Sequence, residues 1–214
     1  MRRHALLLPA LLGLAGAAPA PPPATPGPVP AVEQFGPWLL TCSTDPMTDR
    51  AQCRLTLDRP VEPAREGQGP LALEVAPRRG RMVPVVTARD LALDNAMRGL
   101  LALTGTVQMR FPPNPFFEMP CGLEGRSVVC APRPEDAARA AQELAAADRV
   151  LVRVLGLGRA TAEGTPHELS LAGTAAAITA FRARVPAEQT EEPPPPFNLQ
   201  DLLQRLQSFF LPHP

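Results

Sequence analysis

The sequence predicts a mainly β protein: an antiparallel β-sandwich-like or barrel-like single domain with two short helices and a C-terminal amphipathic helix. Three observations lead to this prediction. Short segments alternate apolar and polar residues, turn-forming residues separate those segments, and proline-rich tracts frame the region between Gln34 and Pro186. A chain of 214 residues holds one domain of ordinary size with tails.

Alternation with a period of two marks the predicted strands, because successive side chains of a strand point to opposite faces. In segment 54–58, for example, Leu55 and Leu57 share one face. The same pattern recurs in segments 71–75, 107–111 and 168–171, while segment 150–155 is more continuously apolar and is predicted to be a central strand. Turn residues separate the strands at 79–80, 112–115, 122–125 and 163–166. Many short strands with frequent turns favour a sandwich or barrel.

Two helices interrupt the β pattern. Pro134 is expected to open the first helix, which runs through an Ala-rich stretch to about Ala147. The second is expected to begin near Thr174, as an N-cap, and to stop before Pro186. Its apolar stripe consists of Ile178, Phe181 and Val185. Segment 89–105 has no period that predicts an element.

Proline accounts for 29 residues, and much of it lies in two tracts, 19–30 and 193–196. Proline lacks the N–H that helices and sheets need, so such tracts are typical of extended linkers. The predicted organisation is therefore a disordered Pro-rich segment at 21–33, a β domain at 34–186, a Pro-rich linker at 187–197 and an amphipathic helix at 198–211.

Residues 1–20 have the three parts of a signal peptide. Arg2 and Arg3 supply positive charge, residues 5–14 are mostly apolar, and residues 15–20 are mostly small, with cleavage favoured after Ala17. The apolar part is shorter than the roughly 20 residues that span a bilayer, which makes an uncleaved anchor the less favoured alternative. The sequence therefore predicts a periplasmic or secreted protein.

Cys42, Cys53, Cys121 and Cys130 form an even set in a chain that is expected to be exported, which favours disulfides. Three pairings are open. Pairing of nearest neighbours would close two short loops of hairpin type, each worth on the order of 2.7 kcal/mol in the chain-entropy model. Neither a zinc site nor a thioredoxin-like redox site is expected, because the sequence has no C-x-x-C motif.

These elements resemble the exported invasion-associated locus B proteins. The mature domain of that family begins with Phe-Gly-x-Trp followed closely by Cys, and later has a second Cys, a Cys pair across a turn, and a closing Leu-x-Leu-x-Gly with an amphipathic helix. The matching segments here are Phe35 to Cys42, Gln52-Cys53, Cys121 to Cys130, Leu169 to Gly173 and Ile178 to Phe181. The resemblance covers residues 35–184 and implies an envelope-associated or secreted protein without catalytic residues.

The sequence departs from the family pattern at two places. Thr174 stands where an aromatic residue is expected after Gly173, and the segment from Val83 to Leu103 aligns poorly. The proline tracts and the C-terminal tail are additions to the family domain.

No catalytic motif is found, so the sequence predicts a non-enzymatic protein with no cofactor. His167 is the sole histidine of the predicted domain and is expected on a surface loop. Glu135-Asp136 could suggest a catalytic carboxylate pair, but a helix N-terminus explains both residues. The alternative is a carboxylate-dependent hydrolase that acts on an envelope glycan, since paired carboxylates need no local motif.

Charge and tail composition bear on partners. The chain has 21 basic and 21 acidic residues, so nucleic-acid binding is not expected. The tail helix has one broad apolar face that needs a surface to bury against, formed by Leu199, Leu202, Leu203, Leu206, Phe209 and Phe210. It could fold back on the domain, or bind an unknown protein partner or a second copy. Membrane-interface binding is less favoured, because Arg205 is the helix's only basic residue.

Overall fold

The computed structural model describes residues 31–64, 69–89, 105–156 and 165–186. Its ten strands form one antiparallel sheet in the order β1-β2-β3-β4-β5-β8-β7-β6-β9-β10. The strands are β1 Ala31–Phe35, β2 Trp38–Thr44, β3 Ala51–Leu57, β4 Leu71–Arg78, β5 Arg81–Ala88, β6 Thr106–Arg110, β7 Phe117–Glu124, β8 Ser127–Cys130, β9 Arg149–Leu155 and β10 His167–Ser170. The signal-peptide segment and the C-terminal tail lie outside the described residues.

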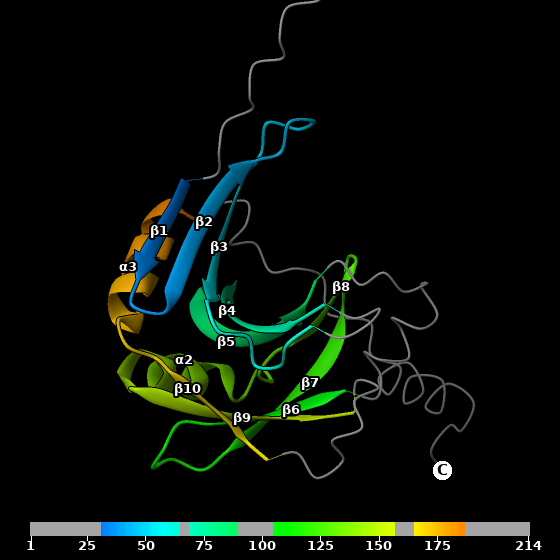
Figure 1. The fold of residues 1–214 in the computed structure, drawn as a ribbon, viewed down its shortest axis with the longest axis vertical. Helices are drawn as coiled ribbons and strands as arrows, with labels where there is room; N and C mark the ends of the chain where they lie inside the picture. The colour runs from blue at the N-terminus through cyan, green and yellow to red at the C-terminus, as the bar shows by residue number, and fades with distance from the viewer. Residues whose placement is uncertain (1–30, 65–68, 90–104, 157–164, 187–214) are drawn as a thin grey trace, which may run out of the picture.

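The sheet curls into a half-barrel, and two helices pack against it (Figure 1). Helix α2, Ala137–Ala146, contacts β5, and helix α3, Thr174–Arg184, contacts β1, β2 and β3. The two helices also touch each other. The mainly β, barrel-like fold with two short helices that the sequence predicts is therefore confirmed.

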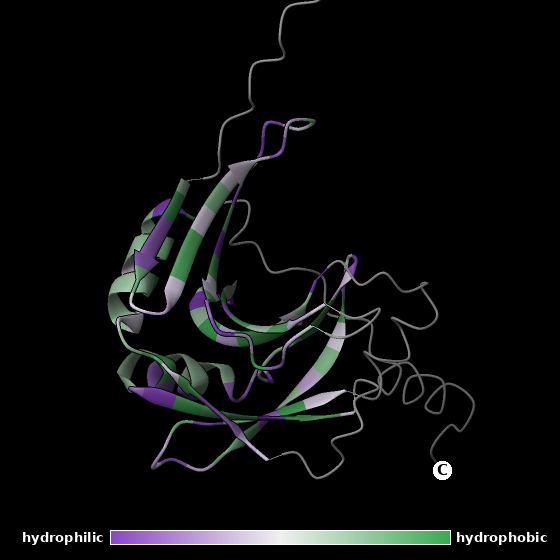
Figure 2. Cartoon of the chain, in the orientation of Figure 1, coloured by the Kyte–Doolittle hydropathy of each residue, from purple (hydrophilic) through white to green (hydrophobic). Residues whose placement is uncertain are grey.

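One contiguous apolar cluster fills the inside of the curled sheet, with buried residues from β2 to β10 and from both helices. Leu71, Leu73 and Val75 face this cluster while alternate residues of β4 point away, as the period of two predicts. Figure 2 shows the alternation as hydrophobic and hydrophilic bands along the strands. The removal of these apolar side chains from water is the largest contribution to the stability of the fold.

Several elements begin elsewhere than the sequence predicts. Helix α2 starts at Ala137, and Pro134 lies in the turn that precedes it. Thr174 is the first residue of α3 and not its N-cap, which is Gly173 in a left-handed conformation with φ 79°. Strand β9 neighbours the edge strand β10, so it is not at the centre of the sheet. Strand β1 begins at Ala31, inside the segment that the sequence assigned to the Pro-rich arm.

Candidate functional site

The turn between β1 and β2 is in backbone contact with the turn that leads from β10 into α3. A Cβ atom on Gly36 would lie 2.6 Å from the carbonyl oxygen of Ala172, which is closer than a real Cβ can approach. A Cβ atom on Gly173 would lie 3.1 Å from the carbonyl oxygen of Phe35. Both glycines have positive φ, so both backbone conformation and space favour glycine. The Phe-Gly-x-Trp and Leu-x-Leu-x-Gly segments are thus two halves of one contact.

Trp38 completes this contact from the inside. Its indole is fully buried, and its Nε1–H donates to Thr174 Oγ1 at 2.8 Å. The Thr174 hydroxyl in turn donates to the carbonyl oxygen of Leu171 at 2.6 Å. A buried indole N–H needs such an acceptor, because burying it unpaired costs about 1–3 kcal/mol. The threonine that departs from the family pattern is therefore the hydrogen-bond partner of Trp38, and both residues close the core.

The four cysteines form two disulfides, and each one links facing positions of a hairpin. Cys42 of β2 is bonded to Cys53 of β3, with a Cα–Cα distance of 4.1 Å. Cys121 of β7 is bonded to Cys130 of β8, with a Cα–Cα distance of 3.9 Å. Of the three pairings that were open, the structure has the one between nearest neighbours. The two disulfides indicate an extracytoplasmic protein.

The fold resembles that of an invasion-associated protein. The crystal structure of invasion associated protein B from Bartonella henselae superposes on this chain with a TM-score of 0.42 and 14% sequence identity. The match covers 72% of this chain and 96% of the other. The matched protein carries the name of the family that the sequence resembles, and we draw no function from the match. No family model matches the chain, and no curated protein matches it.

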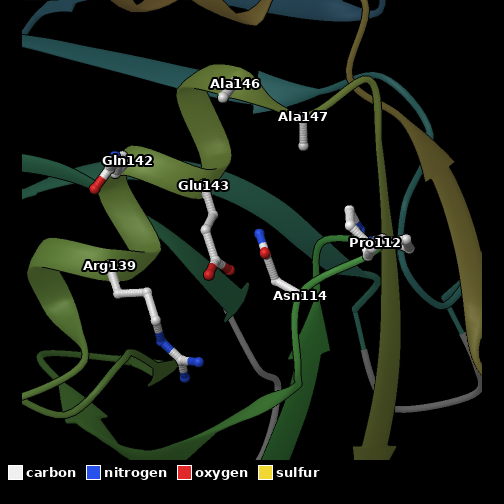
Figure 3. Close-up of a pocket in the computed structure, with 8 residues that line it drawn as sticks. Pro112, Asn114, Arg139, Gln142, Glu143, Ala146 and Ala147 are labelled. Carbon is white, nitrogen blue, oxygen red and sulfur yellow. The ribbon is translucent and has the colours of Figure 1, made fainter.

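A groove of about 370 Å³ lies between α2 and the loop that joins β6 to β7 (Figure 3). The loop contributes Pro112, Pro113 and Asn114. The helix contributes Arg139, Gln142, Glu143 and Ala146, with Ala147 at its end. In Figure 3 the side chain of Glu143 extends from the helix toward Asn114. The groove is therefore a short cleft with polar groups on both walls.

Glu143 is the group in this groove with a perturbed pKa. Burial raises the pKa of its carboxyl above the ordinary value of 4.5, the Arg139 guanidinium opposes this rise, and the Asp136 carboxylate adds to it. Its Oε2 atom is buried and accepts no hydrogen bond within the described part of the chain. Sequence reasoning missed this residue, because a glutamate in an Ala-rich helix gives no signal of burial.

The other charged residues near the groove lie at the start of helix α2. Asp136 lies 3.1 Å from Arg139 and forms an ion pair with it, while the Arg139 guanidinium lies over the Phe117 ring at 5.3 Å from the centroid. Glu135 is exposed and lies in the turn before the helix. These contacts bind the helix to the sheet and do not bring two carboxylates face to face around a cleft.

His167 is exposed at the start of β10 and lines a second, more open hollow of about 700 Å³. The Arg149–Glu168 ion pair beside it has a separation of 3.4 Å and is more than half exposed on both sides, so it contributes little to stability. Within residues 31–64, 69–89, 105–156 and 165–186, no three His, Cys, Asp or Glu side chains gather as metal ligands would. In the same ranges no helix combines the length and apolar character that crossing a bilayer requires.

The expected partner-binding face of the tail lies outside the described residues, from Leu199 to Phe210. Of the residues singled out from the sequence, the structure therefore places the cysteines, the Trp38 motif, His167 and the Glu135-Asp136 pair.

Proposed function

We propose that this is an exported, non-enzymatic protein that acts through protein contacts in the periplasm or at the cell surface. The observation that supports it most is the interior of the half-barrel, which is filled by one contiguous cluster of apolar side chains. A sheet with a filled interior offers its outer surface, its edges and its loops to other molecules, and such contacts are the ordinary means of protein recognition.

Export is supported by two features at different places in the chain. The first is the tripartite segment at residues 1–20, and the second is the use of all four cysteines in disulfides. Cytosolic proteins rarely hold structural disulfides, because the glutathione and thioredoxin systems keep thiols reduced. The proposal therefore includes cleavage of the signal peptide before the protein reaches its place of action.

The composition of the groove argues against the alternative, a hydrolase that acts on an envelope glycan. Glycoside hydrolysis ordinarily uses two carboxyl groups about 5–10 Å apart on either side of the bond. Of the described residues that line the groove, Glu143 is the sole carboxylate. It sits beside a guanidinium and two amides, which is a set that can bind polar ligands but lacks the second acid.

The C-terminal helix predicted at 198–211 is the first proposed contact with a partner. Its apolar face has six large side chains within 12 residues, which is more than a solvated helix keeps exposed. We assign this face to a groove on an unidentified protein partner or on a second copy of the chain.

The tail experiment compares the mature protein with a version that lacks residues 197–214. Co-purifying proteins are identified by mass spectrometry, and self-association is measured by sedimentation. Leu203→Asp, on the apolar face, and Gln204→Asp, on the polar face, form a matched pair. A partner or a dimer that is lost with the deletion and with L203D, but kept with Q204D, supports the proposal. If the deletion instead abolishes cooperative unfolding of the domain, the tail is part of the core.

The enzyme alternative has its own test. The mature protein and E143Q are incubated with purified peptidoglycan, and soluble fragments are measured. We expect no release above buffer with either protein. Release by the mature protein that E143Q abolishes would contradict the non-enzymatic proposal.

A further inference from the structure

The outer half of the β2–β3 hairpin extends beyond the rest of the sheet. β2 and β3 pair with each other from Trp38 and Leu57 out to Thr44 and Ala51. On one side, β1 pairs with β2 as far as Cys42, which faces Ala31, the first described residue. On the other side, β4 pairs with β3 only at Leu55 and Thr56. Residues 43–52 therefore consist of two strand pairs and the turn 45–50 that joins them, without a neighbouring strand among the described residues, and Figure 1 shows this segment projecting from the body. We call residues 43–52 the finger.

The base of the finger is fastened to the body. A two-stranded hairpin is marginally stable in water by itself, so a projecting one needs support. The Cys42–Cys53 disulfide lies where the ribbon leaves the sheet. Cys53 is buried, and its Sγ atom lies 3.4 Å from the carbonyl oxygen of Arg184 at the end of α3. The Arg184 side chain also forms an ion pair with Glu33 of β1. The disulfide and the end of α3 thus fasten the base of the finger to the body.

Asp45 organises the tip of the finger through four hydrogen bonds. Its carboxylate oxygen Oδ1 accepts from the Met47 N–H at 2.7 Å. Its carbonyl oxygen accepts from the N–H groups of Thr48, at 3.3 Å, and Asp49, at 2.8 Å, and its own N–H donates to the carbonyl oxygen of Arg50 at 2.9 Å. Asp49 has φ 54°, a conformation that aspartate tolerates in turns. The tip therefore has a defined shape before any partner binds.

This ordered tip presents a methionine to solvent. Met47 is 89% exposed, against 59% for Val32 and 54% for Phe116, the other large exposed apolar side chains of the described residues. Three charged residues stand near it in the sequence, Asp45, Asp49 and Arg50, so the tip carries one net negative charge. Methionine is flexible and polarisable, which suits it to fill apolar pockets on other proteins. A single exposed apolar residue is common on proteins, but here it ends a projecting, cross-linked and internally hydrogen-bonded ribbon.

We propose that the finger is a docking element: Met47 inserts into an apolar socket on a second, different protein, and basic side chains on the rim of that socket face Asp45 and Asp49. The fixed shape of the tip lowers the conformational entropy that binding costs. The acidic flanks select a basic rim and speed association at low salt. This surface is separate from the C-terminal helix, so it goes beyond the function proposed above and is tested separately.

The test places a photo-crosslinking amino acid at position 47 of the full-length protein in its own cells. A matched control places it at Arg126, the exposed tip of the β7–β8 hairpin. We expect an adduct with one protein at position 47 and none with that protein at position 126. An adduct with a second copy of this chain, an adduct with lipid, or no adduct at position 47 would overturn the proposal.

The crosslinked protein is then purified, and its affinity for the mature protein is measured. Because full burial of a methionine side chain contributes a factor of roughly 10 to 100 in affinity, M47D is expected to weaken binding by at least that factor. M47L should bind within a few-fold of the unaltered protein, and D45N with D49N should reduce the salt dependence of the association rate. Trp38 fluorescence checks that each variant is folded. Equal binding by folded M47D would overturn the proposal.

Discussion

The β2–β3 and β7–β8 hairpins have the same covalent plan, and their surroundings differ. Each joins two antiparallel strands through a disulfide between facing cysteines, with sequence separations of 11 and 9 residues. Strands β7 and β8 have further neighbours on both sides, because β7 pairs with β6 and β8 pairs with β5. Beyond Cys42 and Cys53, β2 and β3 have only each other among the described strands. The β7–β8 hairpin is therefore part of the scaffold, while the outer part of the β2–β3 hairpin projects from that scaffold.

This difference shows what a disulfide does in each place. In the β7–β8 hairpin, which we call the enclosed hairpin, β6 pairs with β7 up to Pro120 and β5 pairs with β8 from Val128 to Cys130. These ladders already hold the strands beside the disulfide, so the disulfide mainly restricts the unfolded chain. In the finger, the disulfide also restricts the native state, because no described strand pairs with residues 43–52 from outside the hairpin. The same cross-link therefore supports global stability in one hairpin and a local shape in the other.

The largest effect is expected in the enclosed hairpin. C121A/C130A should lower the free energy of unfolding by about 2–5 kcal/mol, the range typical of a native disulfide in a small exported domain. The measurement is urea unfolding followed by the fluorescence of Trp38, the chain's single tryptophan. A loss below about 1 kcal/mol would show that this hairpin is not part of the cooperative scaffold.

A smaller effect on global stability is expected from C42A/C53A. The chain-entropy model gives about 2.7 kcal/mol for a loop of about 10 residues, and fraying of the finger in the native state recovers part of that loss. Trypsin should then cut the native variant at Arg50, while the oxidised parent resists. The comparison fails if this variant loses more free energy of unfolding than C121A/C130A, or if Arg50 stays protected.

Thr174→Val tests the inner half of the β2–β3 hairpin, which belongs to the core. The substitution keeps the volume but leaves the buried Trp38 N–H without its acceptor, at a cost of about 1–3 kcal/mol. Thr179→Val is the matched control, because Thr179 is exposed and its hydroxyl bonds only within α3, so a change within about 0.5 kcal/mol is expected. Equal effects of the two substitutions on the free energy of unfolding in urea would show that the Trp38–Thr174 hydrogen bond does not stabilise the fold.

The smallest effect is expected from Glu143→Gln, which tests the groove between α2 and the β6–β7 loop. Because the pKa of Glu143 is raised in the folded state, that state binds the proton more tightly, and stability falls as pH rises through the window above 4.5. The variant should therefore have a higher Tm than the parent at pH 7 and an equal Tm below pH 4.5. A lower Tm at pH 7 would mean that the charged carboxylate makes a favourable contact in the fold.

The sequence predicts strands well where one face meets the core and the other meets solvent. The segment with Leu55 and Leu57 alternates for that reason and is found within β3. The sequence gives no such signal for β5, because both faces of this strand are buried. Val83 and Val85 face a second cluster with Ala137 of α2, while Met82 and Val86 face the main core. A strand buried on both faces has no period of two, so the sequence does not predict β5.

The candidate sites were harder to predict because they depend on which distant segments meet. Nothing local indicates that Gly36 approaches Ala172, or that Thr174 accepts a hydrogen bond from Trp38. The cysteine spacing favours a hairpin between Cys42 and Cys53, but the pairing of its neighbours is needed to place the outer part of that hairpin beyond the described sheet. The pKa of Glu143 is raised by the burial that the fold imposes, and no local sequence pattern indicates that burial.

Amide hydrogen exchange on C42A/C53A and C121A/C130A tests most directly whether the two hairpins have different roles. C42A/C53A should lose protection at the hydrogen-bonded amides of Met47, Thr48 and Asp49, while β4 and β5 stay protected. C121A/C130A should lose protection in β5 and β8 together, while the finger amides exchange only through global unfolding. Loss of protection across β4 and β5 in C42A/C53A, or unchanged protection at the finger tip, would contradict the account.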